Sequence, residues 1–240
     1  MKKLLFVLFA LVSLQTFAQR WETVKGNGNV KKENRTLSAF TSLNAEGPMD
    51  VQIEYGSPGT IGIQADENLL PYIEATVSNN KLTVKSKKGV NLKTTNKIIV
   101  YVSMKEINVL QLSGSGDIKG SGAFTSAGKT EISLSGSGNL ELKFGTFKDI
   151  ALSLSGSGNI NLKGNATNSV EAKVSGSGNI DCVDVSSKNV DVKLSGSGNI
   201  KVYASNSIAA KISGSGNVYY KGDAQNISSK VVGSGKVLKM

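Results

Sequence analysis

The sequence predicts an all-β protein whose C-terminal half is a parallel β-helix of about six coils of 18–22 residues, preceded by a β-rich N-terminal capping unit. Three observations predict this fold. A Gly-Ser-Gly corner recurs about every 20 residues, apolar and polar residues alternate on both sides of it, and the copies keep the same apolar positions. Alternation is typical of strands that bury one face. Sequence copies at one fixed period favour coils in which equivalent residues of successive copies stack on one another.

Residues 1–18 have the composition of a secretory signal peptide. Met1-Lys2-Lys3 precedes an apolar run from Leu4 to Leu14, and the small residue Ala18 follows. The run is too short to cross a bilayer of about 30 Å as a helix. We therefore expect cleavage after Ala18 and export to the periplasm, the outer surface or the medium. No later segment approaches the roughly 18 apolar residues of a membrane helix, so no transmembrane segment is expected in the mature chain.

Residues 19–105 lack the repeated corner but remain rich in strand patterns. Turn signals containing Gly, Pro and Asn separate the segments that alternate or are β-branched. These segments are 50–55, 60–65, 72–77, 81–86 and 97–103. A short helical turn is expected over 66–72, with Asp66 as its N-cap. We expect an antiparallel or mixed β-unit that covers one end of the stack, because an open coil end presents unpaired strand edges.

Residues 106–240 hold the repeat. Counted from the first glycine of each corner, successive corners lie 22, 20, 20, 20, 18 and 19 residues apart, the last being a degenerate copy. Glycine permits positive φ and asparagine tolerates turn conformations, so we assign these residues a structural role. The corner residues are Gly114, Gly116, Gly136, Gly138, Asn139, Gly156, Gly158, Asn159, Gly176, Gly178, Asn179, Gly196, Gly198, Asn199, Gly214, Gly216 and Asn217.

The residues beside the corners predict the interior of the stack. Coils about 4.8 Å apart would place equivalent apolar residues in columns. One column is Leu134, Leu154, Val174, Leu194, Ile212 and Val231, and the other is Leu140, Ile160, Ile180, Ile200, Val218 and Val237. The corner asparagines would form an amide ladder along the stack. Strands of about five residues allow two or three strands in each coil.

Composition excludes several kinds of chemistry. The chain has 28 basic and 18 acidic residues, a net charge of +10 that becomes 26 − 18 = +8 without Lys2 and Lys3. This balance suits an anionic polysaccharide, lipopolysaccharide or nucleic acid. The lack of a run of basic residues favours a solvated lysine-studded surface instead, and export argues against nucleic acid. Cys182 is the single cysteine, so no internal disulfide forms. The absence of histidine excludes histidine-based acid–base catalysis and imidazole metal ligands.

The chain resembles a known family in several segments. Val24-Lys25-Gly26-Asn27-Gly28-Asn29-Val30, Phe40-Thr41-Ser42-Leu43, Asp66-Glu67-Asn68-Leu69-Leu70 and the Gly-Ser-Gly-Asn corners are similar to the putative auto-transporter adhesin, head GIN domain family. The resemblance covers roughly residues 24–240. It implies an exported β-solenoid protein of Bacteroidota-type bacteria, with right-handed coils and an adhesin-like role. It supplies no catalytic motif.

An enzyme that acts on polysaccharides would need converging carboxylates or a carboxylate-bound Ca²⁺. The best candidates are Asp181, Asp184 and Asp191, with Lys173 and Lys193 nearby in the stack. Alternation places Asp181 and Asp191 on outward positions. Calcium repeats need an aspartate at each corner, and here only Asp117 occupies that position. The Gly-x-Gly pairs lack the third glycine and the strand–helix context of a dinucleotide site. We therefore assign no catalytic residue, no metal ligand and no cofactor.

The leading hypothesis is an exported, non-enzymatic protein of the cell envelope or surface. It would be an adhesin-like binding module that presents a β-helical face to glycan or protein. Two alternatives stay open: a polysaccharide-active β-helix enzyme, and a purely structural envelope component. A homo-oligomer is compatible with each. The outward residues between the corners must decide the ligand.

Overall fold

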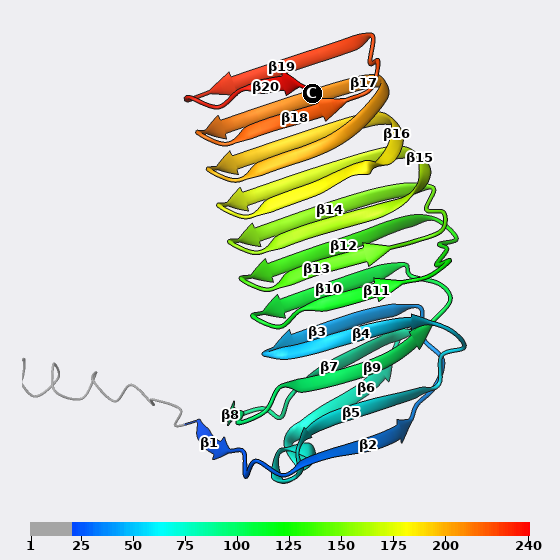
Figure 1. The fold of residues 1–240 in the computed structure, drawn as a ribbon, viewed down its shortest axis with the longest axis vertical. Helices are drawn as coiled ribbons and strands as arrows, with labels where there is room; N and C mark the ends of the chain where they lie inside the picture. The colour runs from blue at the N-terminus through cyan, green and yellow to red at the C-terminus, as the bar shows by residue number, and fades with distance from the viewer. Residues whose placement is uncertain (1–20) are drawn as a thin grey trace, which may run out of the picture.

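The computed structural model describes residues 21–240, and the predicted signal peptide over residues 1–18 lies outside the described residues. Figure 1 shows a tall stack of strands, with the N-terminal strands at one end and the C-terminus at the other. The prediction of an all-β fold with a parallel β-helix of about 6 coils is confirmed. Among residues 21–240, no helix has the length and apolar character to cross a membrane.

Each coil of the helix has two strands that meet at the Gly-Ser-Gly corner. One runs into the corner, as β12 (Lys129–Gly136) does, and the other leaves it, as β13 (Asn139–Lys143) does. We call these the inbound and outbound strands, and their sheets the inbound and outbound sheets. The other coil strands are β10 (Val109–Gly114), β11 (Ile118–Ser121), β14 (Asp149–Gly156), β15 (Asn159–Gly176), β16 (Asn179–Gly196), β17 (Asn199–Gly214), β18 (Asn217–Lys221), β19 (Asn226–Val232) and β20 (Val237–Lys239). The long strands β15, β16 and β17 each leave one corner, bend at a return turn and run into the next corner.

Equivalent strands stack in parallel and in register along both sheets. In the inbound sheet Leu134 of β12 pairs with Leu154 of β14, and in the outbound sheet Leu140 of β13 pairs with Ile160 of β15. Both predicted apolar columns form in this way, because one residue type recurs at one position of every coil. Their members are buried from the first coil as far as Ile212 and Val218.

The last coil departs from this expectation. Ile227 and Val231 of β19 stay in register with Ile208 and Ile212, yet they are 52% and 39% exposed. Within residues 21–240, no strand pairs with the other edge of β19. The interior columns are therefore open to solvent at this coil.

The parallel stack begins before residue 106. Strands β3 (Ser42–Gly47) and β4 (Met49–Tyr55) pair in parallel with β10 and β11, and Gly47 aligns with Gly114. Strands β7 (Lys81–Ser86) and β9 (Ile98–Met104) then extend the inbound and outbound sheets by one parallel strand each. The two sheets thus run without a break from the N-terminal range into the repeat (Figure 1).

Antiparallel strands end both sheets at the N-terminal side. β6 (Ile73–Ser78) pairs with β7, while β5 (Thr60–Asp66) pairs with β9 and β2 (Val30–Thr36) pairs with β5. A separate parallel pair joins β1 (Glu22–Lys25) to β8 (Val90–Lys93). This is the mixed β-unit that the turn signals predict.

Asp66 occupies the expected N-cap position of a short 3₁₀ helix, η1 (Glu67–Tyr72), but the expected capping by its side chain does not occur. Asp66 makes no side-chain cap bond. It is buried instead and accepts hydrogen bonds from the Thr95 amide (2.9 Å), the Asn96 amide (3.3 Å) and the Asn96 side chain (2.7 Å). Burial opposes ionisation, but these hydrogen bonds outweigh it and lower the pKa of Asp66. Asp66 therefore ties η1 to the loop before β9.

Candidate functional site

The corner residues form one edge of the molecule, where inbound and outbound strands meet. Gly176 has φ +126°, and a Cβ placed on it would overlap the backbone oxygen of Gly156 in the preceding coil. Gly178 does not have positive φ, but a Cβ there would overlap the backbone oxygen of Gly158. These contacts support the structural role that we propose for the corners. The close approach of backbone thus accounts for the corner glycines.

The corner asparagines form a ladder of side-chain amides along this edge. The Nδ2 groups of Asn139, Asn159, Asn179 and Asn199 donate to the side-chain oxygens of Asp117, Asn139, Asn159 and Asn179, at 2.9, 2.9, 3.0 and 3.1 Å. Backbone amides continue the ladder, because Asn217 N donates to Asn199 Oδ1 (3.3 Å) and Lys236 N donates to Asn217 Oδ1 (3.1 Å). The ladder starts on a carboxylate, which cannot donate and so fixes the direction of the amides.

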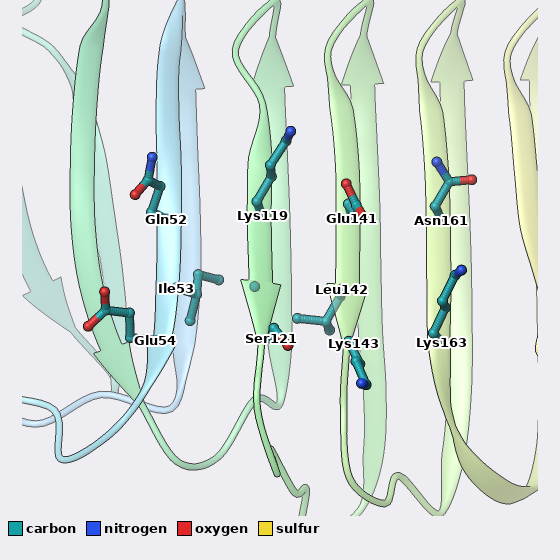
Figure 2. A pocket seen from close by; sticks show the side chains of 11 residues that line it. Gln52, Ile53, Glu54, Lys119, Ser121, Glu141, Leu142, Lys143, Asn161 and Lys163 are labelled. Carbon is teal, nitrogen blue, oxygen red and sulfur yellow. The ribbon is translucent and has the colours of Figure 1, made fainter.

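A depression of about 620 Å³ lies on the outbound face, beside the ladder. Figure 2 shows the polar side chains around it, which are Gln52, Glu54, Lys119, Glu141, Lys143, Asn161 and Lys163. Gly120 occupies the interior column where Ile53 and Leu142 lie in the neighbouring coils, and the short Ser121 follows it. A missing side chain inside and a small one outside leave the face hollow at this coil.

Two further depressions follow the same face along the stack. One of about 300 Å³ shares Lys119, Glu141 and Asn161 with the first. The other, of about 410 Å³, shares Asn161 and reaches Lys201 and Tyr219. All three lie in line from β4 to β18, so an extended ligand can cross several coils, which are spaced about 4.8 Å apart.

The outbound face presents both charges and amides at short intervals. The column that begins at Lys119 continues through Glu141, Asn161, Asp181 and Lys201 on successive coils. Each ladder amide has two N–H groups, of which the ladder uses one. Spare amide N–H groups therefore lie beside carboxylates and ammonium groups along the depressions. Such a surface suits a ligand that carries many hydroxyl or amide groups.

The three candidate aspartates do not converge. Asp181 lies on the outbound part of β16, 3.3 Å from Lys201, and Asp184 lies 3.6 Å from Lys163. Asp191 lies on the inbound part of β16, where it aligns with Glu171 of the preceding coil. In the part of the chain that the structure describes, no three acidic, cysteine or histidine side chains are placed to hold a metal ion.

Cys182 is buried in the interior of the stack, with its Sγ 3.4 Å from the backbone oxygen of Lys201. Burial, with a smaller contribution from the Asp181 charge, raises the pKa of the thiol to about 12. A neutral thiol is a poor nucleophile. Cys182 therefore acts as a small apolar residue.

Sequence reasoning missed the depression over Gly120. Its signal is nevertheless present, because the segment after most corners carries two apolar residues, such as Leu140 and Leu142, whereas Ile118 is followed by Gly120. A gap in one copy of a repeat becomes a hollow only when full copies stack on both sides of it.

Comparison with known proteins agrees with this architecture. The model of the family described as "Putative auto-transporter adhesin, head GIN domain" matches residues 39–224. Among curated proteins, none matches this chain.

Solved structures share the fold. A crystal structure of a putative adhesin from Bacteroides fragilis has 19% identity and a TM-score of 0.82, over 90% of this chain and 100% of the other. A putative lipid binding protein from Parabacteroides distasonis has 27% identity and a TM-score of 0.70, over 91% and 100%. A putative adhesin from Parabacteroides merdae has 27% identity and a TM-score of 0.66, over 91% and 99%.

Proposed function

Because this chain belongs to the putative auto-transporter adhesin, head GIN domain family, we propose that it is an exported, non-enzymatic binding module of the cell envelope. Membership confirms the resemblance drawn from the sequence. The ligand that we propose is a glycan chain lying along the outbound face. Residues 1–18 would act as the signal peptide, with cleavage after Ala18.

The observation that carries this proposal is the line of depressions on the outbound face. They follow the stack axis, and carboxylates, ammonium groups and amides surround them. Sugar hydroxyls both donate and accept hydrogen bonds, so they can use side chains of either charge. Tyr219 is half-buried at one end and offers a ring on which a sugar can pack. Many weak contacts along a regular face suit adhesion better than turnover.

The arrangement of the aspartates favours binding over polysaccharide cleavage. Glycoside hydrolysis needs two carboxyl groups within about 10 Å on either side of one bond. Here Asp181 and Asp184 are each held by a lysine on the outbound face, and Asp191 belongs to the inbound sheet. The structural alternative predicts a stable oligomer without a ligand, which size-exclusion chromatography with light scattering can detect.

Binding can be tested with the chain from residue 19 onward on a glycan array, followed by calorimetry on any positive glycan. Ser121→Trp would fill the depression over Gly120, because Ser121 is exposed at its centre. Ser135→Trp is the matched control, since Ser135 is exposed on the inbound strand β12. We expect Ser121→Trp to weaken glycan binding at least about tenfold and Ser135→Trp to leave it unchanged.

Three results would contradict the proposal. One is the absence of any glycan ligand together with capture of a protein partner. Another is equal binding by the two tryptophan variants. The third is release of new reducing ends from a polysaccharide, lost in the Asp181→Asn, Asp184→Asn, Asp191→Asn triple variant. Because one structural neighbour is named a putative lipid binding protein, lipid vesicles belong in the same screen.

A further inference from the structure

A row of four lysines follows the stack on the inbound face. Lys173, Lys193, Lys211 and Lys230 are aligned on successive coils, and all four are exposed. At about 4.8 Å per coil, the row extends about 14 Å along the stack axis. Like charges in register on neighbouring strands destabilise a sheet. The row is therefore unfavourable for the fold wherever no carboxylate offsets its charge.

Neighbouring carboxylates offset the positive charge of only the first two lysines, Lys173 and Lys193. Glu171 lies 2.7 Å from Lys173 and 3.1 Å from Lys129, and these two lysines lower the pKa of Glu171 to about 2 despite its burial. Asp191 lies 3.9 Å from Lys193. Both carboxylates belong to the column beside the lysine row, two residues before each lysine.

The second half of the row has no such partners. Ala209 and Ser228 occupy the acidic column beside Lys211 and Lys230. Across residues 21–240, no carboxylate lies within ion-pair distance of either lysine. Positive charge therefore increases toward the C-terminal coils.

A groove of about 580 Å³ runs beside the lysine row. Its other side is a row of exposed serines, which are Ser155 on the coil before Lys173 and Ser175, Ser195 and Ser213 on the coils of Lys173, Lys193 and Lys211. Between the rows runs the backbone of interior-column residues such as Leu194 and Ile212, whose side chains are buried in the core. Three successive coils thus offer one ammonium group and one hydroxyl group each, at Lys173 and Ser175, Lys193 and Ser195, and Lys211 and Ser213. On the coil of Lys230, Val232 takes the serine position.

We propose that this groove binds a linear anionic polysaccharide that lies parallel to the stack axis. Its carboxylate or sulfate groups would contact the lysine ammonium groups, and its hydroxyls would contact the serines. Coils about 4.8 Å apart place the lysines at intervals close to the length of one sugar residue, so charged groups that recur along an extended chain can reach several lysines at once. The surface lies on the opposite sheet from the outbound depressions, so it goes beyond the function proposed above and is independent of it.

A single chain fits this surface better than a flat membrane does. Glu171 and Asp191 flank the lysine row on one side, and a flat anionic surface would meet them together with the lysines. A chain lying between the lysines and the serines avoids both carboxylates. The groove also has no aromatic side chain on which a nucleic-acid base can stack.

The test is calorimetry of the chain from residue 19 with polygalacturonate, with neutral dextran as the uncharged probe. The double variant Lys211→Gln, Lys230→Gln removes the two unpaired charges. Lys148→Gln, Lys188→Gln is the matched control, because it removes the same charge from exposed residues outside the groove. We expect the first pair to raise Kd roughly tenfold or more and the control to raise it less than about twofold. Added salt should weaken polygalacturonate binding, because a Debye length of about 10 Å at 0.1 M screens the row.

Extending the row provides a gain of affinity that damage to the fold cannot imitate. Ser153 aligns with Lys173 on the preceding coil, so Ser153→Lys adds a fifth charge to the row. We expect it to tighten binding of polygalacturonate. Thermal unfolding followed by circular dichroism verifies that each variant is folded.

Four outcomes would overturn the proposal. They are no binding of polygalacturonate, equal loss in the two lysine pairs, equal binding of dextran, and lysine-dependent binding of phosphatidylglycerol vesicles in place of polygalacturonate. The proposed outbound site fails separately, through Ser121→Trp and the array glycan. Each proposal can thus fall while the other stands.

Discussion

Replacing Gly176 by alanine tests whether the corners are built on close approach of backbone. The backbone oxygen of Gly156 accepts hydrogen bonds from Ser177 N and Gly178 N, each at 3.0 Å. The new Cβ would lie far inside the 3.0 Å below which Cβ contacts are essentially not seen, and the atom that it meets is this same oxygen. Moving the oxygen by roughly half an ångström lengthens both bonds beyond about 3.2 Å, the outer limit of a good N–H···O bond.

The expected cost has two parts. Each weakened backbone hydrogen bond contributes about 0.5–1.5 kcal/mol. The φ of +126° adds strain of about 1–3 kcal/mol once the residue carries a Cβ. The two parts give about 2–6 kcal/mol, so Gly176→Ala should lower the free energy of unfolding by roughly 4 kcal/mol.

The assay is urea unfolding followed by far-ultraviolet circular dichroism, with Ser177→Ala as the control. Ser177 is exposed at the same corner, so its side chain should contribute less than about 0.5 kcal/mol. If Gly176→Ala unfolds at the same urea concentration as Ser177→Ala, the corner does not depend on glycine and the reasoning is refuted.

Three further predictions concern single side chains. Asn179→Ala removes hydrogen bonds to both neighbouring coils and should cost about 1–2 kcal/mol of unfolding free energy in the same assay, whereas no change would make the ladder dispensable. Asp66→Ala should cost about 3 kcal/mol at neutral pH, because it removes three hydrogen bonds that Thr95 and Asn96 donate to a buried charged group. Because the pKa of Asp66 is lowered from 3.8, its contribution is fully present above that value and is lost as the pH falls through the folded pKa, so urea midpoints of wild type and variant should converge in acid. If the two urea midpoints still differ in acid, the ionised form of Asp66 is not the source of its stabilising effect. Cys182, with its pKa raised to about 12 by burial, should react with a thiol reagent at least about 100-fold faster in denaturant than in the native protein, and equal rates would contradict its burial.

The repeat could be predicted closely because it depends on local patterns. A fixed period places Leu154 beside Leu134 whatever the rest of the chain does, and parallel stacking then aligns the asparagines. The Asp66 cap was mispredicted for the opposite reason. An aspartate before a helical turn usually caps it. Here Thr95 and Asn96, from a distant loop, donate hydrogen bonds to the Asp66 carboxylate instead.

The candidate surfaces depend on which copies become neighbours. The sequence already places Glu171 two residues before Lys173 and Ala209 two residues before Lys211, but only stacking aligns these lysines in one row and brings Lys129 to Glu171. The hollow at Gly120 likewise exists because Ile53, from a strand far earlier in the chain, stacks on the other side of it from Leu142.

The order of residues along the chain is enough to specify a stack of β-coils that turn on Gly-Ser-Gly-Asn corners, with apolar columns inside. Period and alternation are properties of consecutive residues, so the chain carries them before it folds. Three features emerge only from the folded stack: the two strands of each coil, the start of the parallel sheets before β10, and the places where the faces are hollow or charged. Those features depend on contacts between residues about 20 or more positions apart, and only the stacked backbone brings such residues together.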